Sequence, residues 1–393
     1  MKLAEEKLRE IQDIIAKENK STYDLLSGTG GISLFYYSLF TATSNKQYAQ
    51  EAINYINKSI KLLQKSTTYP TYAAGIAGLG TYLAYLESIE FASNIINNEV
   101  DDYLFCQLEH YINNNYYDYL HGVIGIAIYF LYKYRVAKND CTHAALNLTL
   151  RYLQSTKIIE NDGYKWGVPS KKRSGIEFNI SLSHGISAII FFLTKLHHIG
   201  FETDVDITNI ILRAIKYINY QQIPVKQYNS FYPYLAIEST PVITGSRLAW
   251  CYGDLGIALT QYNAGRELDN HQIIQNALEI LKYAAIYRRN IIANGIVDAG
   301  ICHGSAGVAH IFNLMYHNTK LELFKEAADY WIQETILQSA HSDGYAGYSV
   351  WCPGNTYHKS LGLLEGISGI ALSFMSYLYP KTFNWDQFLL MSL

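Results

Sequence analysis

The sequence has no apolar stretch long enough to span a membrane and no apolar segment near its start that is typical of a secretory signal. Its longest apolar runs, residues 124–132 and 186–194, are about half as long as a spanning helix. The first twenty residues, MKLAEEKLREIQDIIAKENK, mix charges throughout. We therefore expect a cytoplasmic protein that meets a membrane only indirectly, through partners.

Cysteine is scarce, and the charge is nearly balanced. The five cysteines are an odd number at irregular spacing, which argues against a disulfide framework. In a reducing compartment, cysteines that converge more often bind metal or take part in catalysis. The formal net charge of −3 gives no electrostatic reason to expect nucleic acid as a partner. Apolar residues, by contrast, make up 49% of the chain, enough for a large core.

The dominant feature is a repeat in which Gly-x-x-Gly is followed by a long apolar run. Six copies carry both glycines: Gly28–Gly31, Gly75–Gly78, Gly122–Gly125, Gly253–Gly256, Gly304–Gly307 and Gly366–Gly369. A seventh copy begins at Gly185 and has Ala188 in the second glycine position. Successive first glycines are 47 to 68 residues apart. Such an interval holds two helices of about 12–15 residues with their connections.

Two kinds of helix alternate in these repeats. The segment after each glycine pair is apolar nearly all round, as in IGIAIYFLY at 124–132, which is typical of a helix buried on every side. The stretches between, such as 47–64 and 271–288, carry a single apolar stripe and belong on the outside. Seven such pairs predict an all-α fold, an (α/α)7 toroid with an inner ring inside an outer ring. No strand or hairpin pattern competes strongly.

We predict one domain over residues 1–393, with an N-terminal helix at about 1–20 packed on it. The intervals 158–181 and 221–247 hold most of the turn-forming residues, so loops at the rim are expected there. The glycines are expected to permit close helix approach and a tight turn into each inner helix.

Two repeats hold the ingredients of a zinc site. Cys251 and Cys302 both lie two residues ahead of the first glycine, and His303 stands between Cys302 and Gly304. In a closed ring these side chains would meet at one rim. Two thiolates and one imidazole leave a tetrahedral zinc with an open fourth position, which is typical of a catalytic site. The alternative is that both cysteines are core residues, because free cysteine is among the most buried types.

The strings around these residues resemble the lanthionine synthetase C family, the lantibiotic cyclases. They are SRLAWCYGDLG at 246–256, ICHGSAG at 301–307, SLSHGIS at 181–187 and the repeated GxxG. The resemblance covers nearly the whole chain, and WCYG followed about 50 residues later by CHG is its most specific part. It implies an α-toroid with one zinc ion per chain, held by Cys251, Cys302 and His303.

The resemblance also implies three catalytic residues. The family's histidine in the fourth repeat matches His184, the acidic residue of YDYLHG in the third repeat matches Asp118, and the arginine ahead of WCYG matches Arg247. His184 is a candidate general acid that first accepts the thiol proton, with Asp118 orienting it. Arg247 would stabilise negative charge or brace Asp118. From the residues alone, His184 is equally consistent with a structural histidine, and Asp118 with a helix cap.

Members of this family add a cysteine thiol of a precursor peptide to dehydroalanine or dehydrobutyrine, forming thioether rings. The implied partners are a dehydrated precursor peptide, a separate dehydratase and an export transporter. Three alternatives stay open: addition of a small thiol such as glutathione to dehydrated residues, a non-catalytic toroid that binds peptide, and an acidic glycosidase. The sequence assigns no role to His121, Trp250 or Glu365.

Overall fold

The computed structural model describes residues 1–92, 98–169, 175–354, 356–379 and 383–392. It falls into two compact units, each described here by itself. Unit 1 comprises Met1–Thr68, Arg247–Trp250 and Leu281–Leu389, and unit 2 comprises Tyr69–Ser246, Cys251–Ile280 and Leu390–Leu393. The prediction of a single domain over 1–393 stays a prediction.

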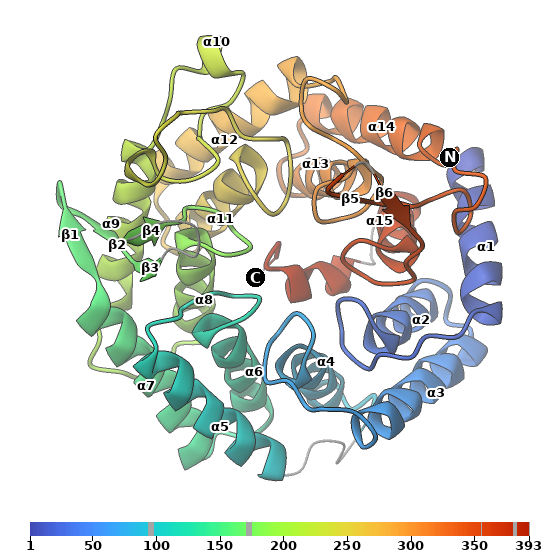
Figure 1. The fold of residues 1–393 in the computed structure, drawn as a ribbon, viewed down its shortest axis with the longest axis horizontal. Helices are drawn as coiled ribbons and strands as arrows, with labels where there is room; N and C mark the ends of the chain where they lie inside the picture. The colour runs from blue at the N-terminus through green and yellow to red at the C-terminus, as the bar shows by residue number, and fades with distance from the viewer. Residues whose placement is uncertain (93–97, 170–174, 355, 380–382, 393) are drawn as a thin grey trace. The chain divides into compact units, whose positions relative to one another are not determined.

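Seven helices follow the seven glycine motifs, and Figure 1 labels them along the chain. They are α2 (Thr29–Thr43), α4 (Ile76–Ser88), α6 (Val123–Val136), α8 (Ile186–His198), α11 (Asp254–Glu267), α13 (Ser305–Thr319) and α15 (Ile367–Leu378). In each of them the first glycine of the motif is the N-cap residue. The helices begin where the repeat predicts.

The remaining long helices are those with one apolar stripe. They are α1 (Lys2–Lys17), α3 (Lys46–Leu63), α5 (Asn98–Asn113), α7 (Asp140–Thr156), α9 (Ile207–Tyr220), α12 (His271–Tyr287) and α14 (Glu322–Leu337). Burial separates the two kinds: twelve of the fourteen residues of α6 are buried, but only three of the eighteen in α3. In the described residues, mostly buried helices alternate along the chain with partly exposed helices, as the repeat predicts.

The second glycine of the motif is required by the turn that precedes its own helix. A Cβ atom at Gly125, Gly307 or Gly369 would lie 1.9–2.1 Å from the carbonyl oxygen of the residue six positions earlier. No side chain can occupy that space. The tight turn expected from the sequence is therefore the main reason for the glycine, and close approach of neighbouring helices is secondary.

In unit 1 the outer partner of the seventh inner helix comes from the start of the chain. Helix α1 packs on α15 and buries Ala4, Leu8, Ile11 and Ile15. The pairs α2 with α3 and α13 with α14 pack more extensively, and Figure 1 shows the members of each lying side by side. The turns of the first and seventh repeats are also joined, because the Leu364 N–H donates to the Leu26 carbonyl at 2.9 Å.

In unit 2 the inner helices pack in series, α4 on α6 and α8 on α11, with α7 and α9 against α6 and α8. The prediction that 158–181 is only loop is wrong. Strands β1 (Ile158–Glu160) and β2 (Gly163–Lys165) form one hairpin, and β3 (Gly167–Pro169) and β4 (Ile176–Phe178) form another. The turn residues Asn161 and Asp162 have φ of 48° and 68°, a conformation that asparagine and aspartate tolerate in two-residue hairpin turns.

Shorter elements complete the fold. The interval 221–247 contains the one-turn helix α10 (Val225–Tyr228) and the 3-10 turn η1 (Ile237–Ser239). Unit 1 adds a hairpin, β5 (Val350–Cys352) with β6 (Thr356–His358), and a 3-10 segment, η2 (Phe383–Leu389). Among the described residues, no helix combines the length and the apolar character that crossing a membrane requires.

Candidate active site

Cys251 in unit 2 is fixed to the turn that carries His184. The Cys251 side chain is buried, and its carbonyl oxygen accepts hydrogen bonds from the N–H groups of Leu182 and Ser183, both at 3.2 Å. The Ser183 hydroxyl donates to the same oxygen at 3.2 Å. Three bonds to one carbonyl hold the WCYG and SLSHG turns of successive repeats together. A candidate metal ligand and a candidate proton carrier thus share one rigid support.

Asp118 makes two different contacts with its two carboxylate oxygens. Oδ1 accepts the backbone N–H of His121 at 2.8 Å, which closes the turn before α6. Oδ2 lies 2.7 Å from Nδ1 of His184. Asp118 is thus not the cap of α6, because Gly122 is the N-cap residue, and its carboxylate instead bonds within the preceding turn and contacts His184. Its catalytic role stays a prediction. The turn fixes the carboxylate, and the fixed carboxylate orients the imidazole.

A cavity of about 530 Å³ opens beside this pair, within unit 2. His184 lines it together with His121, whose ring stacks on His184 with centroids 5.8 Å apart. Tyr234 and Tyr252 line another part, stacked in parallel at 4.2 Å. Burial, and then the nearby Tyr234 phenol, raise the pKa of Tyr252 above its usual range, so its hydroxyl stays protonated. The cavity has the size and mixed polarity of a site for a peptide segment.

Cys302 and His303 occupy the matching turn of unit 1. The N–H groups of Ile301 and Cys302 both donate to the Leu364 carbonyl at 3.0 Å, so this turn is tied to the seventh repeat. Nε2 of His303 lies 3.6 Å from Oδ2 of Asp298. Asp298 is itself fixed, since it accepts the N–H of Gly300 at 3.0 Å and that of Trp351 at 3.1 Å. The Asp298 carboxylate thus faces the imidazole nitrogen of His303 at a distance longer than a hydrogen bond.

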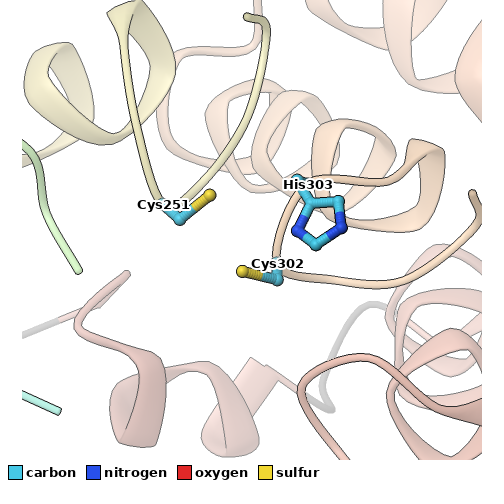
Figure 2. Close-up of side chains that lie close together, drawn as sticks. All are labelled: Cys251, Cys302 and His303. Atoms are coloured by element: carbon cyan, nitrogen blue, oxygen red, sulfur yellow. The ribbon is translucent and has the colours of Figure 1, made fainter. Parts of the chain in front are cut away.

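The three predicted metal ligands come together. The two Sγ atoms of Cys251 and Cys302 and a ring nitrogen of His303 all lie within 4.8 Å of one another. Figure 2 shows the three side chains close together. Zinc bonds of about 2.3 Å to sulfur and about 2.0–2.1 Å to nitrogen would place tetrahedral ligand atoms roughly 3.3–3.8 Å apart. Small side-chain rotations bridge that difference. The donor set is therefore suited to zinc in both chemistry and spacing.

The structure gives Arg247 no defined role, and it gives Trp250 a structural one. Arg247 is half-buried in unit 1, next to a backbone bond from the Leu248 N–H to the Asn294 carbonyl, and its role stays a prediction. Trp250 is buried and donates to the Leu389 carbonyl at 2.7 Å, which makes it a structural anchor for the C-terminal segment.

Sequence reasoning missed Asp298, Glu177 and Tyr234. A signal existed for Asp298, because it stands six residues ahead of its first glycine, as Arg247 does. Glu177 and Tyr234 lie in the long intervals that interrupt the repeat, where no offset can identify them.

Comparison with known proteins identifies the family of this chain. The family model described as "Lanthionine synthetase C-like protein" matches residues 20–390. The chain belongs to the lanthionine synthetase C-like family. The match covers all seven repeats, including Cys251 in one repeat and Cys302 and His303 in the next.

Two relatives of this lanthionine synthetase C-like chain illustrate the range of the likeness. It is 25% identical to nisin biosynthesis protein NisC of Lactococcus lactis subsp. lactis, over 98% of the chain and 95% of the relative. It is 21% identical to glutathione S-transferase LANCL1 of Danio rerio, over 75% of the chain and 70% of that protein.

Among solved structures, nisin cyclase superposes with a TM-score of 0.76 at 22% identity, covering 98% of this chain and 97% of that one. The likeness shows that the family member described here has the α/α-toroid fold, as the seven repeats predict.

Proposed function

We propose that this protein is a zinc-dependent lanthipeptide cyclase. It adds cysteine thiols of a dehydrated precursor peptide to dehydroalanine or dehydrobutyrine and forms lanthionine or methyllanthionine rings. The observation that carries the proposal is the convergence of Cys251, Cys302 and His303 within 4.8 Å in a member of this family. A set with two thiolates and one imidazole leaves a position for a third sulfur.

Cys251, Cys302 and His303 would hold the metal, and the charge of this donor set favours thiol chemistry. When bound, zinc would supply a centre that keeps an incoming thiol in its anionic, nucleophilic form at neutral pH. The two cysteine thiolates already neutralise the charge of the ion, which makes the centre a weaker acid toward water than a site with three histidines. This preference suits a reaction whose nucleophile is sulfur.

His184 carries the proton in this proposal. Because Nδ1 donates to Asp118, Nε2 bears the lone pair of the neutral ring and accepts the proton that leaves the substrate thiol. The sulfur then forms a bond to Cβ of the dehydro residue, the C=C π bond breaks, and negative charge develops on the enolate oxygen. His184 returns its proton to Cα, so atoms and charge balance. Arg247 is proposed to stabilise the developing negative charge or to brace Asp118.

A second candidate reaction keeps the same residues and changes the thiol. The 21% identical relative from Danio rerio is named a glutathione S-transferase, which favours addition of a small thiol to dehydrated residues as the alternative. Peptide mass separates the two reactions: ring formation leaves it unchanged, whereas addition of glutathione increases it.

The proposed setting is the cytoplasm, with a dehydratase that prepares the precursor and a transporter that exports the product. The seven repeats occupy residues 28–369, and we propose that a separate dehydratase supplies the dehydro residues.

Metal analysis combined with product analysis tests the proposal. We expect about one zinc per chain in the purified protein, lost in Cys251→Ala and in Cys302→Ala. His184→Ala should keep its zinc and lose cyclisation. If the Cys302→Ala variant forms rings as well as the parent protein, the chain is a peptide-binding scaffold and not a cyclase.

A further inference from the structure

A separate cavity lies in unit 1, between the outer helices α1 and α3 and the inner helix α2. Its volume of about 430 Å³ is within the range of sites for small ligands. Every residue of these three helices is described, and none takes part in the proposed reaction. The lining residues include three tyrosines and one glutamate: Tyr36, Tyr48, Tyr55 and Glu51.

Tyr36 is a buried tyrosine whose hydroxyl lacks a partner. The residue is only 4% exposed, and within the described part of the chain no group forms a hydrogen bond with its hydroxyl. Burial, and then the Tyr55 phenol and the Glu51 carboxylate, raise the pKa of Tyr36, so the hydroxyl stays protonated and lies near both groups. Because buried polar groups are nearly always hydrogen-bonded, the partner of this hydroxyl comes from what fills the cavity.

The three tyrosine rings form one aromatic cluster. The Tyr36 and Tyr55 rings are stacked at 14° with centroids 5.5 Å apart, and the Tyr48 ring lies 6.3 Å from that of Tyr36. Aromatic rings present a negative face that attracts ammonium and guanidinium groups. The cluster already attracts one ammonium, because Nζ of Lys58 lies 5.6 Å from the centre of the Tyr55 ring. Lys58 donates to Asn19 and does not line the cavity, which is therefore left for another cation.

Glu51 supplies the negative charge that complements such a cation. Burial, and then the Glu51 carboxylate, raise the pKa of Tyr55 as well, so the carboxylate lies close to two tyrosine hydroxyls. No ion pair with Glu51 occurs among the residues that the structure describes. A carboxylate beside aromatic faces favours a ligand with a positive charge.

Two of the tyrosines are held in place by α1. The Gln12 amide donates to the Tyr48 hydroxyl at 3.0 Å, and the Tyr55 hydroxyl donates to the Ile15 carbonyl at 3.3 Å. Both rings are thus fixed between α1 and α3, so this wall of the cavity is formed before a ligand arrives.

We propose that the cavity between α1, α2 and α3 binds an organic cation with N–H groups, such as the alkylammonium of lysine or the guanidinium of arginine. The Tyr36 hydroxyl and the Glu51 carboxylate accept its N–H groups, and the tyrosine rings pack on its alkyl chain. Such a group comes either from a free amine or from a side chain of a peptide. The inference goes beyond the proposed function, because no residue of the cavity takes part in that reaction.

The test is a calorimetric titration of the full-length protein with three capped amino acids: lysine, arginine and the neutral norleucine. We expect the two cations to bind at least about tenfold more tightly than norleucine. Tyr36→Phe removes only the hydroxyl and should weaken lysine binding about fivefold, the effect of one lost hydrogen bond. Glu51→Gln should weaken it by about five- to tenfold, and this variant stays folded because Glu51 is exposed.

Glu5→Gln is the matched control, because Glu5 is an exposed carboxylate of α1 that does not line the cavity. It should bind lysine as tightly as the parent protein does. Equal binding of norleucine and lysine would overturn the inference, and so would lysine binding that neither Tyr36→Phe nor Glu51→Gln weakens.

A short capped peptide with one central lysine separates the two sources of the cation. If it binds more tightly than capped lysine, the site takes a peptide side chain, and if it binds equally or more weakly, the site takes a free amine. Because these titrations measure binding alone, their outcome does not depend on cyclase activity.

Discussion

At the scale of single residues, Asp118 joins the fold to the chemistry. One oxygen closes the turn before α6, and the other holds His184. Sequence reasoning offered a helix cap and a partner of His184 only as alternatives, since a carboxylate before a helix is equally expected as a cap. To choose between these roles one must know whether His184, 66 residues further along the chain, lies close to Asp118 in space. The local sequence does not give that distance.

Replacing Asp118 with asparagine separates the two roles. The asparagine oxygen still accepts the His121 N–H, so the fold and the zinc content should be preserved. The amide no longer stabilises the imidazole as a proton acceptor, and we expect cyclisation to slow by about 10²–10⁴-fold. Single-turnover rates with zinc analysis measure both effects.

Asp118→Ala is the comparison, because it also removes the acceptor of the His121 N–H in the turn before α6. It should lose about 1 kcal/mol of stability, the contribution of one hydrogen bond, in addition to the activity. Equal rates in Asp118→Asn and the parent protein would show that His184 does not need this carboxylate.

At the scale of elements, the seven inner helices were predictable because one local rule sets each start. The first glycine is the N-cap, and the second leaves space for the carbonyl of the preceding turn. The hairpins were not predicted, although Asn161-Asp162-Gly163 between short apolar segments is a hairpin signal. Strands of three residues are too short to show alternation, so the turn was interpreted as part of a loop.

Repeat four shows how alanine is tolerated in the second glycine position. The Ala188 N–H donates to the Gly185 carbonyl at 3.0 Å, three residues earlier in the first turn of α8. In contrast, the N–H groups of Gly307 and Gly369 donate to carbonyls seven residues earlier, both at 3.4 Å. Only the bond of the second motif position differs, because the Ile186 N–H still donates to the Asn179 carbonyl seven residues earlier, as the Ser305 and Ile367 N–H groups do to their own turns.

Gly307→Ala should therefore lower the stability of the fold. Its Cβ would lie 2.0 Å from the Ile301 carbonyl oxygen, in the backbone that leads into Cys302. We expect a loss of about 3 kcal/mol in the free energy of unfolding, measured by urea titration, and weakened zinc binding. The control is Gly200→Ala, where φ is +62° and a Cβ meets nothing within 4 Å. That variant should lose only about 1 kcal/mol from backbone strain, and an equal loss in both would contradict the steric explanation.

At the scale of the whole molecule, the first segment of the chain, Met1–Thr68, and the late segment Leu281–Leu389 belong to the same unit. The outer helix that packs on the seventh inner helix, α15, is α1 from the start of the sequence. Sequence analysis predicted this helix and its packing on the domain, but not that it completes the last repeat. The helix on which α1 packs is the one whose apolar surface no other helix covers. Which helix that is depends on how the repeats pack and not on the local sequence of α1.

The contact between α1 and α15 predicts a specific loss of stability. Ile11 is fully buried on α1, so Ile11→Ala should lower the free energy of unfolding by about 2–4 kcal/mol. Ile292→Ala is the matched control in the same unit, because that side chain is 90% exposed and its truncation should change stability by at most about 0.5 kcal/mol. Urea unfolding of both variants measures the difference. A small effect of Ile11→Ala would mean that α15 keeps its packing without α1, and that the seventh repeat is complete without the start of the chain.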